Sequence, residues 1–200
     1  MTNPVYVIAV VEGLPDMEVA RALIKKTGLE LYCEPLNKRG KGNIDKYLSE
    51  FNNSAKSLSW LVVRDMDHDA DCPPELKTNL LPNPEKRMCF CIAVREIESW
   101  LMADSERFAK FMSVPEALIS KNPESLGDPK SEVIRLAKKS TDRNLRLDMI
   151  PEPESIIQEG PAYASRLAEF ASNHWRPIVA SKRSESLGYC IKKLKSLKKT

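Results

Sequence analysis

The sequence predicts an α/β protein with a mainly parallel, four-stranded sheet flanked by helices and followed by a helical C-terminal extension. Short apolar runs alternate with segments of helical periodicity in the first half of the chain, which is typical of strand, helix, strand crossovers. The apolar runs are nearly continuous, as expected for strands covered on both faces. After residue 110 the strand patterns fade, and prolines and helical segments take over.

The strands are expected at residues 5–11, 29–35, 58–64 and 88–94. A crossover helix is predicted before Gly28, where apolar residues repeat at helical spacing, and a second one after the basic, glycine-rich loop at 37–42. Further helices are expected at 96–112, 131–140, 162–174 and 187–197, with a linker around Pro151 and Pro153. We therefore divide the chain into a first domain, residues 1–110, and a helical extension, residues 111–200, packed on or beside it.

Composition limits the class of protein. A chain of 200 residues with 42% hydrophobic and 30% charged residues is typical of a soluble globular protein with one substantial core. Glu12 interrupts the first apolar run, which has no basic flank, so we predict neither a membrane span nor a signal peptide. Five scattered cysteines favour the reducing cytoplasm over a disulfide framework. Cys89 and Cys91, two apart in an apolar strand, are interpreted as packing residues rather than zinc ligands.

Acidic residues follow three of the predicted strands at their carboxyl ends. In a parallel sheet these ends meet at one edge, which is where open α/β sheets bind ligands. Carboxylate oxygens are the ligands that Mg²⁺ prefers, and so many like charges together are costly without a cation. We predict a site here for one or two Mg²⁺ (or Mn²⁺) ions. The acidic residues at these strand ends are Glu12, Asp16, Asp65, Asp67, Asp69, Glu96 and Glu98, and among them Asp65 and Asp67, with a glutamate from a neighbouring strand, form the candidate metal cradle.

Two acidic motifs carry a resemblance to a known family. The EGxxD pattern from Glu12 to Asp16 follows an apolar strand, and a later apolar strand ends in DxDxD from Asp65 to Asp69. This combination resembles the Toprim domain of topoisomerases, primases, small RNA-processing nucleases and OLD-family nucleases. The REIESWLMAD segment, residues 95–104, further resembles small Toprim-like proteins related to the OLD-family nucleases. The resemblance covers about the first 105 residues and follows the remainder only loosely.

The resemblance implies a Toprim (Rossmann-like) fold for residues 1–110, as a catalytic domain, and assigns roles within it. Glu12 is implied to be the general acid or base, while Asp65 and Asp67 bind the metal with Asp69 in support. In OLD-type members further acidic residues complete a second metal site, which here would be Asp16 and either Glu96 or Glu98. The latter two could instead simply occupy the first turn of a helix, where the dipole favours acids.

The chain is too short for the tyrosine-bearing domain of a topoisomerase or the polymerising and zinc modules of a primase. We therefore predict a metal-dependent nuclease that hydrolyses DNA or RNA with water as nucleophile and Glu12, Asp65 and Asp67 as catalytic residues. The net charge is only +3, but basic residues concentrate after residue 175, where they could follow phosphates or form a solvated helix face. The nucleic-acid-binding candidates are Arg64, Lys130, Lys182 and Arg183.

Alternatives remain open for both the residues and the function. Arg64 and Arg95 could form ion pairs that orient the acidic clusters rather than contact nucleic acid. The chain could be a non-catalytic or partner-activated nucleic-acid-binding module, served by a separately encoded ATPase, since OLD-like relatives often associate with ATPases. It could also be a small-molecule phosphohydrolase using the same carboxylates. A role in defence against phage is suggested by analogy with the same relatives.

Overall fold

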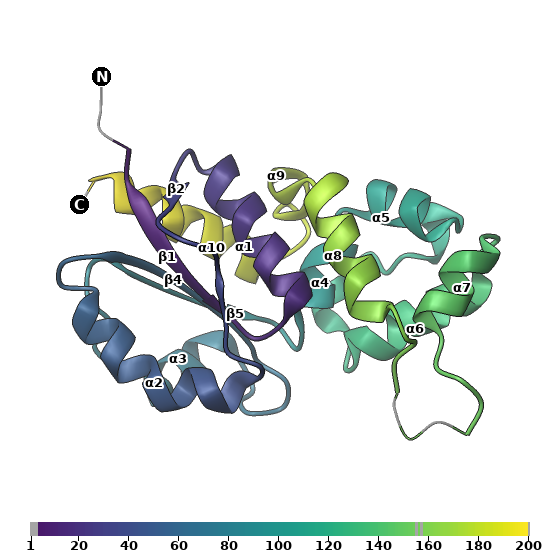
Figure 1. Cartoon of the computed structure of the whole chain (residues 1–200), viewed down its shortest axis with the longest axis horizontal. Helices are drawn as coiled ribbons and strands as arrows, with labels where there is room; N and C mark the ends of the chain where they lie inside the picture. Colours follow the sequence, from purple (N-terminus) through teal and green to yellow (C-terminus); the bar gives the residue numbers. More distant parts are fainter. Residues whose placement is uncertain (1–3, 155, 157, 200) are drawn as a thin grey trace.

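A parallel sheet with helices on both faces forms one half of the computed structural model, which describes residues 4–154, 156 and 158–199 (Figure 1). Its strands are β1 (Tyr6–Val11), β2 (Glu30–Leu31), β3 (Leu36–Asn37), β4 (Ser59–Asp65) and β5 (Met88–Ala93). The order across the sheet is β2, β1, β4, β5, with β3 also pairing with β1, and every pairing is parallel. The predicted fold class, α/β with a mainly parallel sheet and a helical C-terminal region, is confirmed.

The strand predicted at residues 29–35 is two short strands in the structure. β2 pairs with the start of β1 at Tyr6 and Val7, and β3 pairs with the end of β1 at Val10 and Val11. Pro35, which has no N–H to donate to a ladder, lies between the two strands. The sheet therefore has five strands where four were predicted, and both short strands occupy the same edge.

The two faces of the sheet belong to two apolar clusters. Alternate residues of β1 point to opposite sides: Val7 and Ala9 face α1 (Leu14–Lys26), while Ile8 and Val10 face α2 (Lys41–Ser54) and α3 (Pro73–Leu80). Figure 1 shows α2 and α3 on one side of the strands and α1 with α10 on the other. Burial on both faces explains why the strands read as continuous apolar runs.

The second half of the chain is helical. Its elements are α4 (Ile97–Met102), α5 (Ser105–Met112), α6 (Pro129–Lys139), α7 (Arg143–Met149), α8 (Tyr163–Asn173), α9 (Pro177–Ala180) and α10 (Glu185–Ser196), with 3-10 turns at Glu116–Leu118, Pro123–Ser125 and Leu197–Lys199. α8 packs against α1, and α10 returns to pack against β5. The apolar cluster on this face is continuous from the sheet into these helices. The division at residue 110 stays a prediction about independent folding.

The helix predicted at 96–112 is broken between α4 and α5. Asp104, fully buried at the break, accepts hydrogen bonds from the backbone N–H of Arg176 at 2.9 Å and from its guanidinium at 2.6 and 3.0 Å. A contact between residues so far apart has no local sequence pattern. The predicted linker around Pro151 and Pro153 lies between α7 and α8, and residues 155 and 157 fall outside the described residues.

Every helix in the described part of the chain is too short or too polar to cross a lipid bilayer.

A glycine at the entry to α8 gives a test of this packing. A Cβ at Gly160 would lie 2.4 Å from the carbonyl carbon of Met149 and 2.5 Å from the backbone oxygen of Asp148, both backbone atoms that cannot move away alone. We expect Gly160→Ala to lower the free energy of unfolding by about 2 kcal/mol or more, measured by urea denaturation. Gly42→Ala is the matched control, because nothing lies within 4 Å of a Cβ there. Equal effects from both substitutions would contradict this close approach.

Candidate metal centre

Two acidic residues far apart in the chain meet at the carboxyl edge of the sheet. Glu12 directly follows β1, and Asp65 ends the neighbouring strand β4. The backbone N–H of Asp65 donates to Oε1 of Glu12 at 2.7 Å, across 53 positions of sequence. The predicted convergence of the EGxxD and DxDxD motifs is therefore present as a direct hydrogen bond.

Asp16 and Asp65 each carry a buried oxygen without a partner. Asp16 lies in the first turn of α1 and is 4% exposed. The Oδ1 atoms of both residues are enclosed and accept no hydrogen bond from the described part of the chain. Gly13 lets the Asp16 carboxylate lie close to the backbone after β1, since a Cβ at Gly13 would lie 3.1 Å from Oδ2 of Asp16. Buried carboxylate oxygens without donors are costly, and a bound cation would offset that cost.

Burial and like charges raise the pKa of these acids. Burial raises the pKa of Asp65 well above its ordinary value, and the charges of Asp16, Glu98 and Glu12 add to the effect. Burial raises the pKa of Glu12 to about 7, with contributions from Asp16 and Asp67, and raises the pKa of Asp16 to about 6. These carboxyls therefore form one electrostatically linked group, and it can retain protons near neutral pH.

Both acids of the α4 segment lie near this group, in different surroundings. Glu98 is buried, accepts a hydrogen bond from the Tyr163 hydroxyl at 3.0 Å, and has its pKa raised to about 7 by burial and by Glu96. Glu96 is the N-cap residue of α4, and its Oε2 accepts from the backbone N–H of Lys130 at 2.9 Å. Since Glu98 is the one whose charge raises the pKa of Asp65, it is the better second-site candidate.

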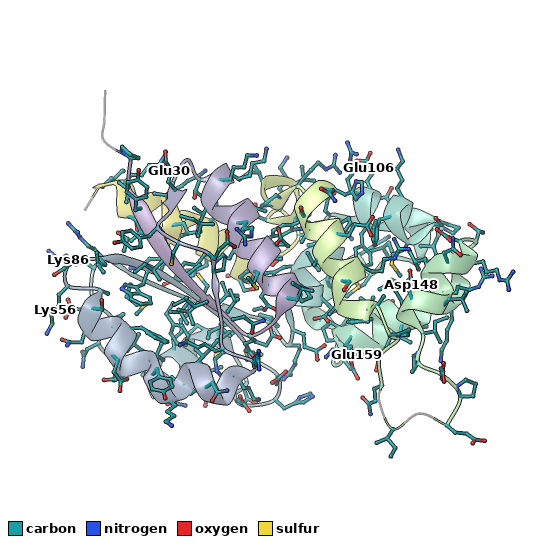
Figure 2. The ribbon with its side chains drawn as sticks, viewed as in Figure 1. Glu30, Lys56, Lys86, Glu106, Asp148 and Glu159 are labelled. Atoms are coloured by element: carbon teal, nitrogen blue, oxygen red, sulfur yellow. The ribbon has the colours of Figure 1, made fainter. Side chains whose placement is uncertain are left out.

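Lys130, which was predicted to bind nucleic acid, forms a salt bridge with an acidic residue. Its Nζ lies 2.8 Å from Oε1 of Glu159, in the loop leading into α8 (Figure 2). Sequence reasoning missed both Glu159 and Tyr163. Neither lies in a motif, and both reach the site only because α8 packs beside α1. The helical extension thus supplies part of the surroundings of the acidic group.

The other end of the DxDxD run is paired with cations. Nζ of Lys41 lies 2.6 Å from Oδ2 of Asp67 and 2.7 Å from Oδ2 of Asp69. The loop before α2 brings Lys41 to this place, because its Gly40 N–H donates to the carbonyl of Glu12 at 3.1 Å. The hydrogen bond from Lys41 lowers the pKa of Asp69, with Arg64 contributing further. Asp67 and Asp69 are therefore neutralised by side chains, whereas Asp65 is not.

The two arginines beside the acids have structural partners. Arg64, 3% exposed, donates to both carboxylate oxygens of Asp45 at 2.8 Å and to Asp69 at 2.7 Å. Arg95 donates to the carbonyl of Asp67 at 2.7 Å and accepts the Asp67 N–H on its own carbonyl at 2.7 Å. Asp67 has φ 46°, a left-handed conformation that this pair of bonds holds. Arg64 therefore forms ion pairs with acidic residues, as in the alternative interpretation, and Arg95 stabilises the turn at Asp67.

The remaining predicted nucleic-acid contacts lie elsewhere. Lys182 and Arg183 precede α10, and the Arg183 guanidinium donates to the carbonyls of Ser120 at 2.7 Å and Lys121 at 3.4 Å. Lys182 is exposed. Within the described residues no hydrogen bond or salt bridge joins either side chain to the acidic group. The structure brings together Glu12, Asp16, Asp65 and Glu98, with Asp67 and Glu96 at the border, and it does not bring Lys182 or Arg183 to them.

The residues present fit a hard divalent cation. All donors are carboxylate oxygens, and two of them are buried without partners. Across the residues that the structure describes, no three carboxylates bring oxygens within 4.8 Å of one another, so binding would have to draw them together. After burial, like charges contribute to the raised pKa values, and their repulsion opposes that approach in the absence of a cation.

Fold and site together define an α/β protein with an acidic centre at the carboxyl edge of a parallel sheet. Comparison of the chain with protein-family models, with curated proteins and with solved structures gives no match. The residues themselves therefore carry the functional argument.

The raised pKa values predict how stability depends on pH. Unfolded carboxyls lose their protons near pH 4, whereas those of Glu12, Asp16 and Glu98 are retained to about pH 6 to 7 in the folded chain. Between these two pH values the folded state binds more protons than the unfolded state. The stability that these groups contribute at lower pH is therefore lost as pH rises through the pKa values of the folded chain. In EDTA, we expect these groups to lower the melting temperature of the chain by on the order of 5 °C between pH 5 and pH 8.

Mg²⁺ or Mn²⁺ should reverse this loss, with a larger effect at pH 8 than at pH 5. Asp16→Asn should reduce both the pH dependence and the response to metal, whereas Glu50→Gln, an exposed acid on α2, should change neither. A response to metal that is the same at both pH values, or unchanged in Asp16→Asn, would contradict the assignment.

Lys41 predicts a competition with metal. Its ammonium neutralises Asp67 and Asp69, so a divalent ion must displace it before Asp67 can serve as a ligand. We expect Lys41→Gln to tighten Mn²⁺ binding about two- to fivefold, measured by calorimetry. Lys46→Gln, on the same helix but beside Tyr47, is the control. Weaker binding in Lys41→Gln would mean that Lys41 supports the ion instead of competing with it.

Proposed function

We propose that this chain is a metal-dependent nuclease of Toprim type that hydrolyses phosphodiester bonds of DNA or RNA with Mg²⁺ or Mn²⁺. The observation that carries the proposal is the meeting of Glu12, Asp16 and Asp65 at the carboxyl edge of the sheet, with two buried carboxylate oxygens left without partners. The EGxxD and DxDxD motifs that resemble Toprim domains supply these same residues.

Glu12, Asp16, Asp65 and Glu98 would hold the metal, and Asp67 would join them once Lys41 moves away. A bound divalent ion would supply positive charge against the developing charge on the phosphoryl group. Carboxylates alone cannot provide that charge. The DxDxD run therefore has two functions: Asp65 and Asp67 bind metal, while Asp69 is held by Lys41 and Arg64 and supports the loop.

Glu12 is suited to move a proton. The Asp65 N–H holds one carboxylate oxygen in place, and burial raises the pKa of Glu12 to about 7. A group that titrates near neutral pH can both accept and return a proton during hydrolysis by water. Among the basic residues proposed to hold nucleic acid, Lys182 is exposed and available, whereas Arg64 is buried and acts by orienting Asp69.

The partner and the biological role are proposed from the resemblance alone. OLD-like relatives suggest a separately encoded ATPase partner and a role in defence against phage or in repair. A cytoplasmic location is supported by five cysteines that are all free in the structure.

The test is a cleavage assay on labelled DNA and RNA with Mg²⁺, Mn²⁺ or EDTA. We expect metal-dependent cleavage by the wild-type chain, and a loss of at least about a hundredfold in Glu12→Gln and in Asp65→Asn, because the first removes the group that transfers the proton and the second removes a metal ligand. Glu50→Gln on the outer face of α2 should retain full activity. Circular dichroism and melting curves establish that the variants fold.

Other results would assign another function. Cleavage that survives both Glu12→Gln and Asp65→Asn would remove the mechanism. Hydrolysis of nucleotides or model phosphoesters with polynucleotides left intact would indicate a small-molecule phosphohydrolase. Binding of nucleic acid without turnover under any metal would indicate a regulatory module, and adding a candidate ATPase would then reveal activation by a partner.

A further inference from the structure

Three cysteines meet in the core between the sheet and the last helix. Cys89 and Cys91 lie on the same face of β5, and Cys190 of α10 packs against them. All three are completely buried, and their sulfur atoms lie within 4.8 Å of one another, with 3.5 Å between Cys89 and Cys91. The interpretation of Cys89 and Cys91 as packing residues missed Cys190, which lies 99 positions beyond Cys91 and is placed there only by the fold.

The geometry of this thiol cluster, Cys89, Cys91 and Cys190, fits a three-coordinate ion. Three sulfur ligands in a plane around one ion, each about 2.3 Å away, lie about 4 Å from one another. One sulfur separation in the structure is 3.5 Å and the other two do not exceed 4.8 Å, so a small adjustment of side chains would complete the site. Nothing comparable exists among the carboxylates of the described residues, whose oxygens do not come as close together.

The donor set selects the kind of ion. Thiolates prefer soft ions, Cu(I) above all, whereas Mg²⁺ prefers oxygen. Structural zinc sites take four ligands, and within the described residues no histidine or carboxylate joins the three sulfurs. A dry, all-sulfur site with three ligands therefore matches a three-coordinate Cu(I) ion better than a tetrahedral zinc ion.

Positive charge lies beside the cluster. Lys77 of α3 is half-buried, and its Nζ lies 3.7 Å from the centre of the Tyr189 ring. Burial lowers the pKa of Lys77, and interactions with Cys91, Cys190 and Cys89 partly restore it. No carboxylate in the described part of the chain forms a salt bridge with Lys77. The charge of Lys77 favours the thiolate forms, which are the forms that bind metal, whereas burial raises the pKa of Cys89 and Cys190 and opposes the loss of their protons.

A pocket lies beside this region. It has a volume of about 520 Å³ and lies between α3, the outer edge of β5 and α10. Lys77, Ile92, Ser186 and Tyr189 are among its lining residues. Lys77 and Tyr189 thus both line the pocket and interact electrostatically with the buried cysteines.

We propose that Cys89, Cys91 and Cys190 form a three-coordinate site for a soft metal ion, with Cu(I) as its occupant, reached through the pocket beside Lys77 and Tyr189. The bound ion would join α10 to β5 and so attach the C-terminal helix to the sheet. The three thiols release their protons to solvent as they become ligands. The proposal is independent of the acidic centre, since the two sites share no residue.

The test uses the full chain, reduced and kept free of oxygen, titrated with Cu(I) in competition with the chromophoric chelator bicinchoninate. We expect one Cu(I) per chain, a first coordination shell of three sulfurs by X-ray absorption, and a higher melting temperature on binding. Cys91→Ser and Cys190→Ser should each weaken binding by more than about tenfold. The double variant Cys33→Ser, Cys72→Ser is the matched control, because both cysteines are exposed, and it should bind as the wild type does.

Lack of Cu(I) binding by the reduced wild-type chain would overturn the proposal, as would binding that disappears in the Cys33→Ser, Cys72→Ser variant. Preferential retention of Zn²⁺ with a fourth ligand would overturn the three-coordinate assignment. If Cys190→Ser fails to fold, Cys190→Ala keeps the small apolar volume of the site and is read in its place. The X-ray absorption spectrum of the wild-type chain decides the ligand set independently of any variant.

Discussion

The hydrogen bond from the Asp65 N–H to the Glu12 carboxylate is the interaction on which the acidic centre depends. β1 and β4 are parallel neighbours in register from Val7 with Ser59 to Val10 with Val62, so their carboxyl ends reach the same edge together. The bond then sets how close the first acid lies to the second strand. α1 begins two residues after Glu12 and adds Asp16 to the same edge. α4 begins shortly after β5 and adds Glu98. Parallel topology therefore concentrates negative charge at one edge.

Some of these acidic residues are paired with cationic side chains, and one buried acid is not. Asp67 and Asp69 are paired with Lys41 and Arg64, and the hydrogen bond from Lys41 lowers the pKa of Asp69. Asp65 has no cationic partner in the described part of the chain, and burial raises its pKa. A carboxyl that is already paired gains little from an added cation, whereas an unpaired buried one gains much. The part of the site nearest Glu12 is thus where a metal ion would change the free energy most.

Sequence patterns predicted the elements and residues that depend on local periodicity or on topology. β4 and β5 match the predicted apolar runs closely, and Glu12 and Asp65 were expected to meet because parallel strands end at one edge. Residues that reach a site only through the packing of helices distant in sequence were not predicted. Tyr163, Glu159 and Cys190 belong to no motif, and their neighbours are set by α8 and α10. The break between α4 and α5 has the same origin, because the partner of Asp104 is Arg176.

The helical extension belongs to the acidic centre rather than to its periphery. α8 packs on α1, the helix that carries Asp16, and its first residue, Tyr163, donates to Glu98. Lys130 of α6 supplies the N–H that binds Glu96. Since burial is the largest cause of the raised pKa values, the helices that exclude water there determine the chemistry of the carboxyls as much as the strands that present them. Sheet and extension must therefore fold against each other before the site acquires its electrostatic character.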